Sequence, residues 1–462
     1  MNVDELILDS NTPASEKVKK LKVKAYAVPE WAKLEKEYDP NKHPIMSTAL
    51  YPDKTRKDGS LEKVTRIKLG LQKLATKRMA EMIFGIPVKR VYGAKSEDEK
   101  KVAAIIEKIL AKNRIDSVNL KRAKKLYSSC EILTIWYAKE EKNSSYGEET
   151  NFKLRCKTYS PKDKDSIYVS VDEFEDVVAL SVGYTRVEEE KNVEYLDTYT
   201  AQYHTRYRND GTEWAEDIAP EKIIIGKIPG IYTYREEPIW EDTSDNTYEI
   251  EWSLSRAGNY LRKNQKPIFG IFSDKKISVG DEKTGDNEGR SVLRFGKDDK
   301  AEYIGWEQAT DSLKYFNDTL YRQFFTQIQL PDLSFDNMKA TPMSGEARIQ
   351  MFIDAHLKVE DEKGDIIEFL DREINVVKAF MVVMYPNYKE AIESLSVEHI
   401  ITPYAIANGK EKVEELSTGA GGKAIVSRRT AVQNLGLAAD VEEELKQLES
   451  DDAIQIGGAY NV

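Results

Sequence analysis

The stretch LPDLSFDNMKATPMSGEAR at residues 330–348 separates two long helical patterns. Pro331 and Pro342 each stop a helix, and the residues between them are mainly polar, so the stretch must be a loop. Ser344 is a good N-cap for the helix that follows, which we expect to run to about Phe380 with a kink at Gly364. The second half of the chain is therefore predicted to contain a helix, a polar loop and another long helix.

The helix before this loop is predicted to begin at Thr310. Its ~19 residues would span about 30 Å. Its apolar residues recur every three or four positions, which predicts that they pack on one face. The first four of them are Leu313, Phe316, Leu320 and Phe324.

The amino-terminal half begins with helical periodicity. Apolar spacing predicts one long helix over Glu62–Phe84, which ends at the helix stop Gly85-Ile86-Pro87. Two more helices are expected, one around 102–110 and one around 118–130.

The pattern then changes to short segments rich in β-branched and aromatic residues, separated by polar turns such as RNDGTE. This composition predicts an antiparallel sheet. The expected strands are Glu131–Lys139, Phe152–Tyr159, Ile167–Val171, Val177–Thr185, Tyr195–Arg206 and Ile223–Ile225.

Helical spacing returns at about Ser244–Lys263 and is followed by an apparent strand, PIFGIF. The polar, glycine-rich residues 273–289 are predicted to be a loop or a small exposed module. Two short strands, SVLRF and AEYIGW, lead into the helix at Thr310, and an acidic helix, DVEEELKQLESDD, lies near the carboxyl terminus. The fold class is therefore α+β.

Length and composition limit the class of protein. The chain has 462 residues, and 69 Lys and Arg against 80 Asp and Glu give a formal charge of −11. The longest apolar run, AFMVVMY at residues 379–385, is far shorter than a membrane span, and the acidic start MNVDELILDS does not resemble a secretion signal. We therefore expect no membrane partner, folding in a cytoplasm, and reduced thiols at Cys130 and Cys156.

Charge is unevenly distributed. Residues 54–78 contain nine Lys or Arg and two acids, whereas residues 360–373 contain seven acids and two bases, and residues 440–452 seven acids and one base. Most non-specific affinity for DNA comes from neutralising phosphates, so a protein that grips DNA along its length is usually basic. Tight, distributed DNA binding is not expected, and a solvated helix face is the preferred interpretation of the basic segment.

No motif predicts catalysis. The segment STGAGGKA at residues 417–424 lacks the first Gly and the magnesium-binding hydroxyl of a phosphate loop, because Ser417 and Ala424 occupy those positions. No nucleophile elbow or HExxH is present, and DEKTGDNEG at residues 281–289 lacks the ligand spacing of a calcium loop. We therefore predict no catalytic residue, no metal site and no cofactor.

Three features of the chain resemble the portal proteins of tailed bacteriophages, in particular the siphophage portal of the SPP1 type. The first is the stretch at residues 330–348, where the family has a Pro-Asp-Leu-Ser turn, a polar loop and a helix that restarts at Ser-Gly. This chain departs from the family at Glu346 and Arg348, where the family more often has aliphatic residues. The second is the helix leading into FGIPV at residues 84–88, and the third is the order of elements from Ser244 to Ile328. Together the resemblance covers roughly residues 60–450.

The resemblance implies a portal fold with long wing and stem helices, a β-rich antiparallel wing section, a small α/β clip and a mainly helical crown. It further implies a homo-oligomeric ring, a dodecamer, at one capsid vertex. The implied divisions are 1–245 (wing), 246–266 (stem helix), 267–305 (clip), 306–328 (stem helix), 329–343 (tunnel loop), 344–395 (long wing helix) and 396–462 (crown).

In such a ring the tunnel loop would face double-stranded DNA. DNA carries a phosphate charge about every 1.7 Å, so a sliding channel should avoid a continuous basic lining. Residues 329–343 fit this requirement, since Lys339 is their one positive residue. The candidate DNA-facing residues are Asn337, Met338, Lys339 and Thr341.

The resemblance also implies partners and a location. The ring would conduct DNA during packaging and ejection, and it would dock the terminase large subunit, a head-tail adaptor, and the major capsid and scaffolding proteins. It would be assembled in the host cytoplasm and reside in the virion, and it would not be an enzyme. A closed head-to-tail ring needs two complementary surfaces on each subunit, which the basic and acidic segments could supply.

Two alternatives remain open from the sequence. A metal-dependent nucleic-acid-processing enzyme predicts magnesium-dependent turnover that is lost on substitution of a single Asp or Glu. A monomeric DNA-binding protein that uses residues 54–78 predicts tight binding with a steep dependence on salt.

Overall fold

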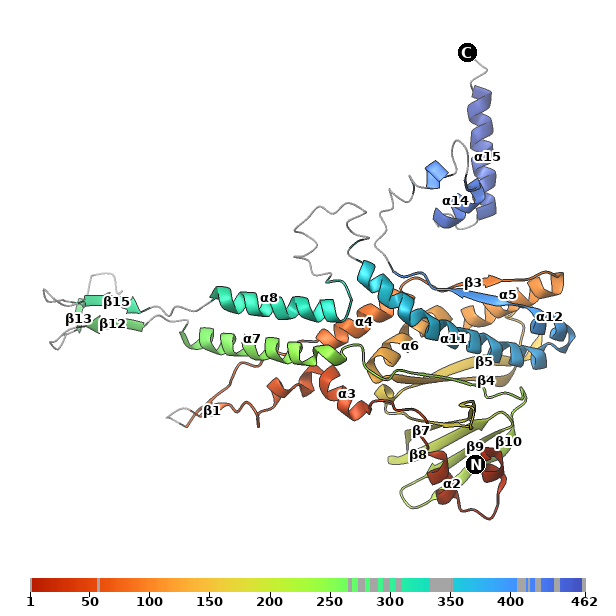
Figure 1. Cartoon of the computed structure of the whole chain (residues 1–462), viewed down its shortest axis with the longest axis horizontal. Helices are drawn as coiled ribbons and strands as arrows, with labels where there is room; N and C mark the ends of the chain where they lie inside the picture. Colours follow the sequence, from red (N-terminus) through yellow and green to blue (C-terminus); the bar gives the residue numbers. More distant parts are fainter. Residues whose placement is uncertain are drawn as a thin grey trace.

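The computed structural model describes residues 2–55, 59–264, 268–272, 279–282, 290–293, 300–304, 310–332, 350, 352–404, 413, 416–419, 425–435 and 441–458. Figure 1 shows a body of helices and sheets from which two long helices project side by side. The α-helices are α1 (Val3–Leu8), α2 (Ala14–Leu21), α3 (Trp31–Tyr38), α4 (Leu71–Phe84), α5 (Glu97–Lys112), α6 (Ile115–Ser129), α7 (Ser244–Asn264), α8 (Thr310–Gln327), α11 (Ile353–Met384), α12 (Lys389–Ser394), α14 (Arg428–Leu435) and α15 (Val441–Gly458).

The strands combine into small antiparallel sheets, so the fold class is α+β, as predicted. The two largest sheets have the strand orders β11-β4-β5 and β10-β9-β8-β7-β6. The strands are β1 (Lys54–Thr55), β2 (Leu61–Glu62), β3 (Lys89–Tyr92), β4 (Glu131–Asn143), β5 (Thr150–Tyr159), β6 (Ser166–Val171), β7 (Val177–Glu188), β8 (Lys191–Thr200), β9 (Tyr203–Asn209), β10 (Trp214–Lys222), β11 (Gly230–Tyr234), β12 (Ile268–Phe272), β13 (Val279–Glu282), β14 (Arg290–Leu293), β15 (Lys300–Ile304) and β16 (Val397–Ile400).

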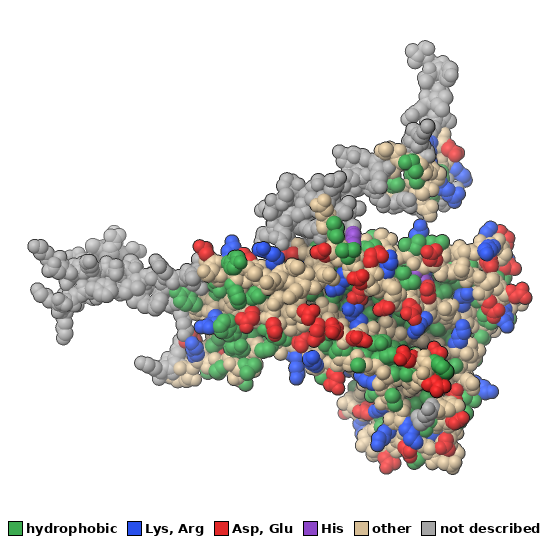
Figure 2. All heavy atoms as spheres, viewed as in Figure 1, with side chains coloured by type: hydrophobic (Ala, Val, Ile, Leu, Met, Phe, Trp, Pro, Cys, Tyr) green, Lys and Arg blue, Asp and Glu red, His purple; other side chains and the backbone are tan. Residues whose placement is uncertain are grey.

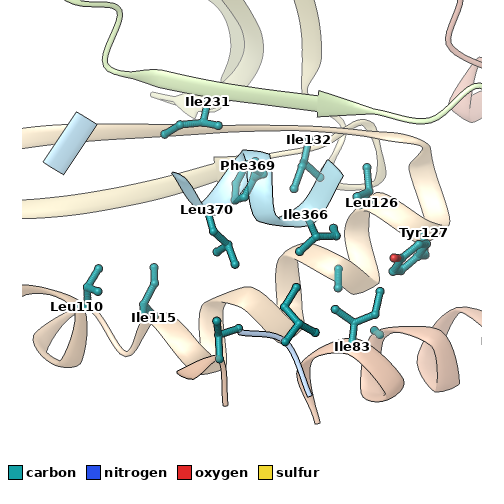
Figure 3. Close-up of a cluster of buried hydrophobic side chains, with 14 of the residues drawn as sticks. Ile83, Leu110, Ile115, Leu126, Tyr127, Ile132, Ile231, Ile366, Phe369 and Leu370 are labelled. Atoms are coloured by element: carbon teal, nitrogen blue, oxygen red, sulfur yellow. The ribbon is translucent and has the colours of Figure 1, made fainter. Parts of the chain in front are cut away.

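The three-stranded sheet β11-β4-β5 lies at the centre of the body. Alternate residues of a strand face opposite sides of its sheet. Ile132 and Ile231 accordingly face α6 and α11 in the main hydrophobic core, which Figure 3 shows in close-up. Leu133 and Ile135 face the other way, into a second core shared with the five-stranded sheet. The central sheet is therefore buried on both faces.

The five-stranded sheet is also covered on both faces. Its inner face places Ile167 and Val182 in the second core. On its outer face, Leu196 and Tyr207 pack against α1 and α2 through a third core. The body is therefore layered, with helices, the three-stranded sheet, the five-stranded sheet and short helices in that order.

A buried ion pair fixes α11 to the body. The Arg122 guanidinium on α6 donates to both carboxylate oxygens of Glu373 on α11, at 3.0 and 2.7 Å. Trp136 Nε1 on β4 donates to the same carboxylate at 2.8 Å, and Asn119 accepts from Arg122 at 2.8 Å. Buried charges are tolerated when they are paired and hydrogen-bonded in this way.

The prediction of one helix over Glu62–Phe84 is wrong in its first part. α4 begins at Leu71, and residues 63–70 belong to neither a helix nor a strand. We call residues 63–70 the strap. Leu69 packs against the main hydrophobic core. Four backbone N–H groups of the strap donate to side chains of other segments instead of to its own carbonyls. Tertiary hydrogen bonds thus override the local helical spacing.

The strand predictions are confirmed in kind and wrong in several details. The expected strand over Tyr195–Arg206 is two strands, β8 and β9, joined by a turn, and residues 223–225 are not a strand. The expected single sheet is two sheets, and β10 and β11 were missed. Residues 279–282 of the predicted polar loop form β13, which pairs with β14.

The long helices were predicted more successfully. α7, α8 and the acidic α15 lie where apolar spacing placed them. α11 runs as one helix through Gly364, and the predicted cap Ser344 lies outside the described residues. The described part of residues 267–305 consists of the strands β12 to β15, so the helical half of the predicted α/β clip stays a prediction. Among the described helices, none is both long enough and apolar enough to span a membrane.

Candidate functional site

The helices α7 and α8 form an antiparallel pair that projects from the body (Figure 1). Asn246 near the start of α7 donates from Nδ2 to Gln327 Oε1 at the end of α8, at 2.9 Å. The predicted packing residues divide by depth: Phe324 at the body is fully buried, Leu320 and Leu313 are half-buried, and Phe316 is 44% exposed. The apolar side chains of α8 are therefore buried where the helix meets the body and partly exposed where it projects from the body.

The outer part of the pair exposes large apolar side chains. Tyr315 on α8 is 74% exposed, and Trp252 and Leu261 on α7 are 37% and 59% exposed. Figure 2 shows apolar side chains scattered over the projecting helices between charged ones. Single exposed apolar residues are ordinary, but several on one slender element indicate a surface that another chain covers.

The body end of α8 stops at a well-formed C-cap. Gln329 has φ of 54°, in the left-handed region, and its N–H donates to the Thr326 carbonyl at 3.2 Å. The Leu330 N–H donates to the Phe325 carbonyl at 3.3 Å, and both of these side chains are buried. This is the Schellman arrangement, in which an apolar contact accompanies the paired hydrogen bonds.

Two cations hold the chain on either side of Gln329. Arg78 on α4 donates from Nη1 to the Pro331 carbonyl, and its guanidinium lies 5.1 Å from the centre of the Phe325 ring. Burial lowers the pKa of Arg78, and Asp332 opposes that effect. Lys358 on α11 donates from Nζ to the Ile328 carbonyl at 2.8 Å. The start of the polar loop is therefore anchored from two different helices.

The strap runs along α7 and is held by side chains of that helix. The N–H groups of Thr65, Ile67 and Leu69 donate to Asn259 Oδ1, Ser255 Oγ and Glu251 Oε1, at 2.6, 2.8 and 2.6 Å respectively. Two extended residues advance about 6.6 Å, and four helical residues advance about 6.0 Å, so the two repeats match. Alternate strap residues thereby reach one face of α7.

A buried polar cluster supports the base of α7. Glu251 also contacts His43 Nδ1 at 2.7 Å, and both side chains are fully buried. His43 Nε2 lies 2.7 Å from the Glu37 carbonyl, and the Glu37 carboxylate accepts from Trp240 Nε1 and Ser244 Oγ at 3.0 Å each. The helix pair is therefore mounted on a hydrogen-bonded base.

The candidate DNA-facing residues Asn337, Met338, Lys339 and Thr341 lie outside the described residues, as does the rest of 333–349. Both flanks of this segment are described and firmly placed. Pro331 is held by Arg78, and Phe352 on the far side is 1% exposed, with its carbonyl accepting from the His356 N–H at 2.8 Å. Residues 333–349 thus connect two fixed points.

The described residues were searched for metal-binding clusters and reactive thiols. Within them, no cluster of three or more His, Cys, Asp or Glu could hold a metal ion. Both cysteines are free, and burial raises the pKa of the Cys130 thiol to about 12, so it stays protonated at neutral pH. The anchors Arg78 and Lys358 and the exposed Trp252 and Tyr315 were missed in the sequence. For Trp252 and Tyr315, the one signal available in the sequence was a large aromatic residue on the polar face of a predicted helix.

Comparison with known proteins gives the family. The model of the phage portal protein family, SPP1 Gp6-like, matches residues 19–457. A search of curated proteins found no match.

Two solved structures align with most of this chain at low similarity. The neck of an empty GTA particle, computed with C6 symmetry, aligns with 9% identity and a TM-score of 0.41 over 87% of this chain and 95% of that chain. The neck of a native GTA particle, computed with C12 symmetry, aligns with 9% identity and a TM-score of 0.39 over 92% of this chain and 99% of that chain. The family model covers nearly the whole chain, and on that match the chain belongs to the SPP1 Gp6-like phage portal protein family.

Proposed function

We propose that twelve copies of this chain close head to tail into a ring at one vertex of a phage capsid, and that double-stranded DNA is packaged and ejected through the central opening. The observation that carries this proposal is the projecting pair α7 and α8, which exposes Trp252, Leu261, Tyr315 and Phe316 although its base is firmly held. A slender apolar-faced pair is stable when neighbouring copies cover it.

In this ring the chain divides as its family does. Residues 1–245 with 344–395 form the wing, 246–266 and 306–328 the stem helices, 267–305 the clip and 396–462 the crown. Residues 329–343 form the tunnel loop. The anchoring of Pro331 by Arg78 supports this role, because a loop that contacts moving DNA needs fixed ends.

DNA contact is assigned to Asn337, Met338, Lys339 and Thr341. Each phosphate that a protein neutralises raises its affinity for DNA and slows sliding. A loop with one lysine can therefore contact the phosphates without binding the DNA tightly. The prediction is that replacing residues 335–341 by a Gly-Ser loop of equal length leaves the ring intact and impairs packaging. A loss of the ring itself would instead show that the loop has an assembly role.

The ring also serves as a docking platform. We assign it the terminase large subunit, the head-tail adaptor, and the major capsid and scaffolding proteins as partners, within the virion after assembly in the host cytoplasm. ATP hydrolysis is assigned to the terminase, because residues 417–424 do not match a phosphate-binding loop. The portal itself makes and breaks no covalent bond in this scheme.

Electron microscopy of the purified chain tests the proposal directly. Class averages should show rings with a central hole, and mass photometry should give a species near a multiple of the 52.8 kDa subunit. A homogeneous monomer at micromolar concentration would contradict the ring. The competing enzyme hypothesis is tested in the same sample, where magnesium-dependent turnover of DNA by the monomer would replace the present proposal.

A further inference from the structure

Among the described strands, none pairs with one edge of β11. β11 lies at the end of the order β11-β4-β5, and β4 is its one partner within the part of the chain that the structure describes. An open edge of this kind presents unpaired backbone N–H and C=O groups, which form a template for another extended chain.

The ladder shows which groups point outward. The Trp136 N–H donates to the Pro229 carbonyl, and the Arg235 N–H donates to the Cys130 carbonyl, at the two ends of the β11–β4 pairing. Because hydrogen-bonded pairs alternate in an antiparallel ladder, the groups that face β4 belong to residues 231 and 233.

The outward groups therefore belong to Gly230, Tyr232 and Tyr234. Within the described part of the chain, no hydrogen bond reaches the outward N–H of Tyr232 or Tyr234. Both amides are thus available to an added strand.

The open edge lies in a groove of about 1160 Å³. One wall is α11, through Phe369 and Val376, and the other is the five-stranded sheet, through Val177 and Leu180. All five residues of β11 line it, and Tyr26 stacks over Tyr234 with ring centres 4.4 Å apart. The groove therefore has the length of a strand, a hydrogen-bonding floor, and a lining of mixed polar and apolar side chains.

The rim of the groove is acidic. Seven Asp or Glu line it against three Lys or Arg. Two of these acids are neutralised locally, Glu362 by Arg235 and Glu368 by Arg372. The other five are exposed and form no ion pair with any described residue; they are Glu175, Glu236, Glu237, Asp361 and Asp365. Figure 2 shows acidic side chains gathered where α11 faces the five-stranded sheet.

We infer that this groove binds an extended, lysine- or arginine-bearing segment of a partner protein, which adds to β11 as a fourth strand. Backbone bonds to Tyr232 and Tyr234 would supply affinity, and alternate basic side chains would meet the acidic rim, as in other cases of strand addition. A segment of a second copy is disfavoured because the chain has a net charge of −11 and its basic extended strap is already bound along α7. The inference does not depend on ring formation.

The first test uses a fluorescent nine-residue peptide in which lysine alternates with valine or threonine, added to the full chain. Hydrogen exchange of the Tyr232 and Tyr234 amides should slow about tenfold or more when the peptide is bound, as for any newly paired edge strand. No change at these amides, with binding elsewhere, would overturn the inference. Protection of both amides in assembled rings before peptide is added would also overturn it, since a neighbouring copy would then be the occupant.

The second test separates backbone pairing from charge. Y234P and Y234A both remove the ring, but only proline removes the outward N–H, so Y234P should bind the peptide about tenfold more weakly than Y234A. Equal binding by the two variants would refute strand addition.

A charge variant probes the rim. D361N/D365N should weaken binding about threefold to tenfold in low salt, whereas D354N/E390Q, which changes two exposed acids outside the groove, should not. An equal effect of both double variants would refute the role of the rim.

A final probe leaves the protein unchanged, in case Y234P fails to fold. Two N-methylated peptides are compared, one methylated on every lysine and the other on every intervening residue. An added strand directs alternate N–H groups to β11, so one methylated set should abolish binding and the other should preserve it. Equal behaviour of the two sets would overturn the inference.

Discussion

Arg122 on α6 forms a buried ion pair with Glu373 on α11. Its guanidinium and the Glu373 carboxylate are each 3% exposed, and the carboxylate also accepts from Trp136. Arg122→Ala should lower the free energy of unfolding by ~3–5 kcal/mol, because it leaves a buried carboxylate without its cation. Urea unfolding of the purified subunit, followed by circular dichroism, measures this loss.

The matched control replaces both members of the pair. R122M/E373M removes the charges together and leaves apolar side chains in their place, so it should destabilise the subunit less than R122A alone. If the double variant is the less stable one, then the hydrogen bonds of Glu373 to other residues matter more than the ion pair.

His204 predicts a dependence of stability on pH. Burial alone would lower its pKa, but hydrogen bonds to Asp197 and Glu221, at 2.9 and 2.8 Å, outweigh that effect and raise it above 6.5. A raised folded-state pKa means that the stabilisation is fully present below pH 6.5 and is lost as pH rises through the folded-state value. The difference in melting temperature between wild type and H204Q should therefore shrink between pH 6 and pH 9.

Asp197 supplies the control for that titration. It accepts from His204, from Arg206 and from the Tyr184 hydroxyl, and despite burial these contacts lower its pKa. D197N removes the charge that favours protonated His204, so the pH dependence assigned to His204 should weaken in that background. An unchanged pH profile would show that another group titrates.

At the scale of elements, the strap shows where sequence periodicity fails. Val64, Ile67 and Leu71 are spaced like one helical face, and nothing local prevents a helix there. The deciding groups, Ser255 and Asn259, lie nearly two hundred residues away and accept from the strap N–H groups. Short-range patterns contain no information about such partners, so the start of α4 could not be predicted from them.

Removing those partners tests the strap. S255A/N259A leaves two partly buried N–H groups without acceptors, at a cost of about 1–3 kcal/mol each. Amide exchange at Thr65 and Ile67 should become faster, whereas E249Q on the exposed face of α7 should leave it unchanged. Unaltered protection in the double variant would mean that apolar contacts alone hold the strap.

The helix α8 can be tested with proline. F316P lies in the middle of the helix, where proline removes a hydrogen bond and costs about 3 kcal/mol or more, so ring formation or DNA filling should fail. D311P lies in the first turn, where the N–H has no helical partner, and should be tolerated. Negative-stain images of the two variants make the comparison, and normal rings from F316P would mean that α8 does not shape the assembly.

At the scale of the whole molecule, the sequence predicted the order of the large elements better than their connections. α7, α8 and α15 carry their own apolar stripes and could be located from spacing alone. The division of the strands into two sheets depends on which faces meet in space, as with Leu133 against Val182, and this pairing leaves no local trace. For the candidate site, the helices on either side of residues 333–349 were predicted, and the loop between them stays a prediction. The anchors Arg78 and Lys358 come from helices that spacing could not connect to this site.

The final prediction concerns assembly and uses the aromatic face of α8. Tyr315 and Phe316 are 74% and 44% exposed in one subunit, and covering both in a ring would contribute roughly 2–4 kcal/mol per interface, on the scale of burying one or two large side chains. Y315S/F316S should therefore melt like the wild type as a subunit but require at least about 30-fold higher concentration to form rings in mass photometry. F174S is the matched control, since Phe174 is 77% exposed on the turn between β6 and β7, away from the projecting helices. Rings that form equally well from Y315S/F316S, or that fail equally with F174S, would show that α8 is not the surface that joins neighbouring copies.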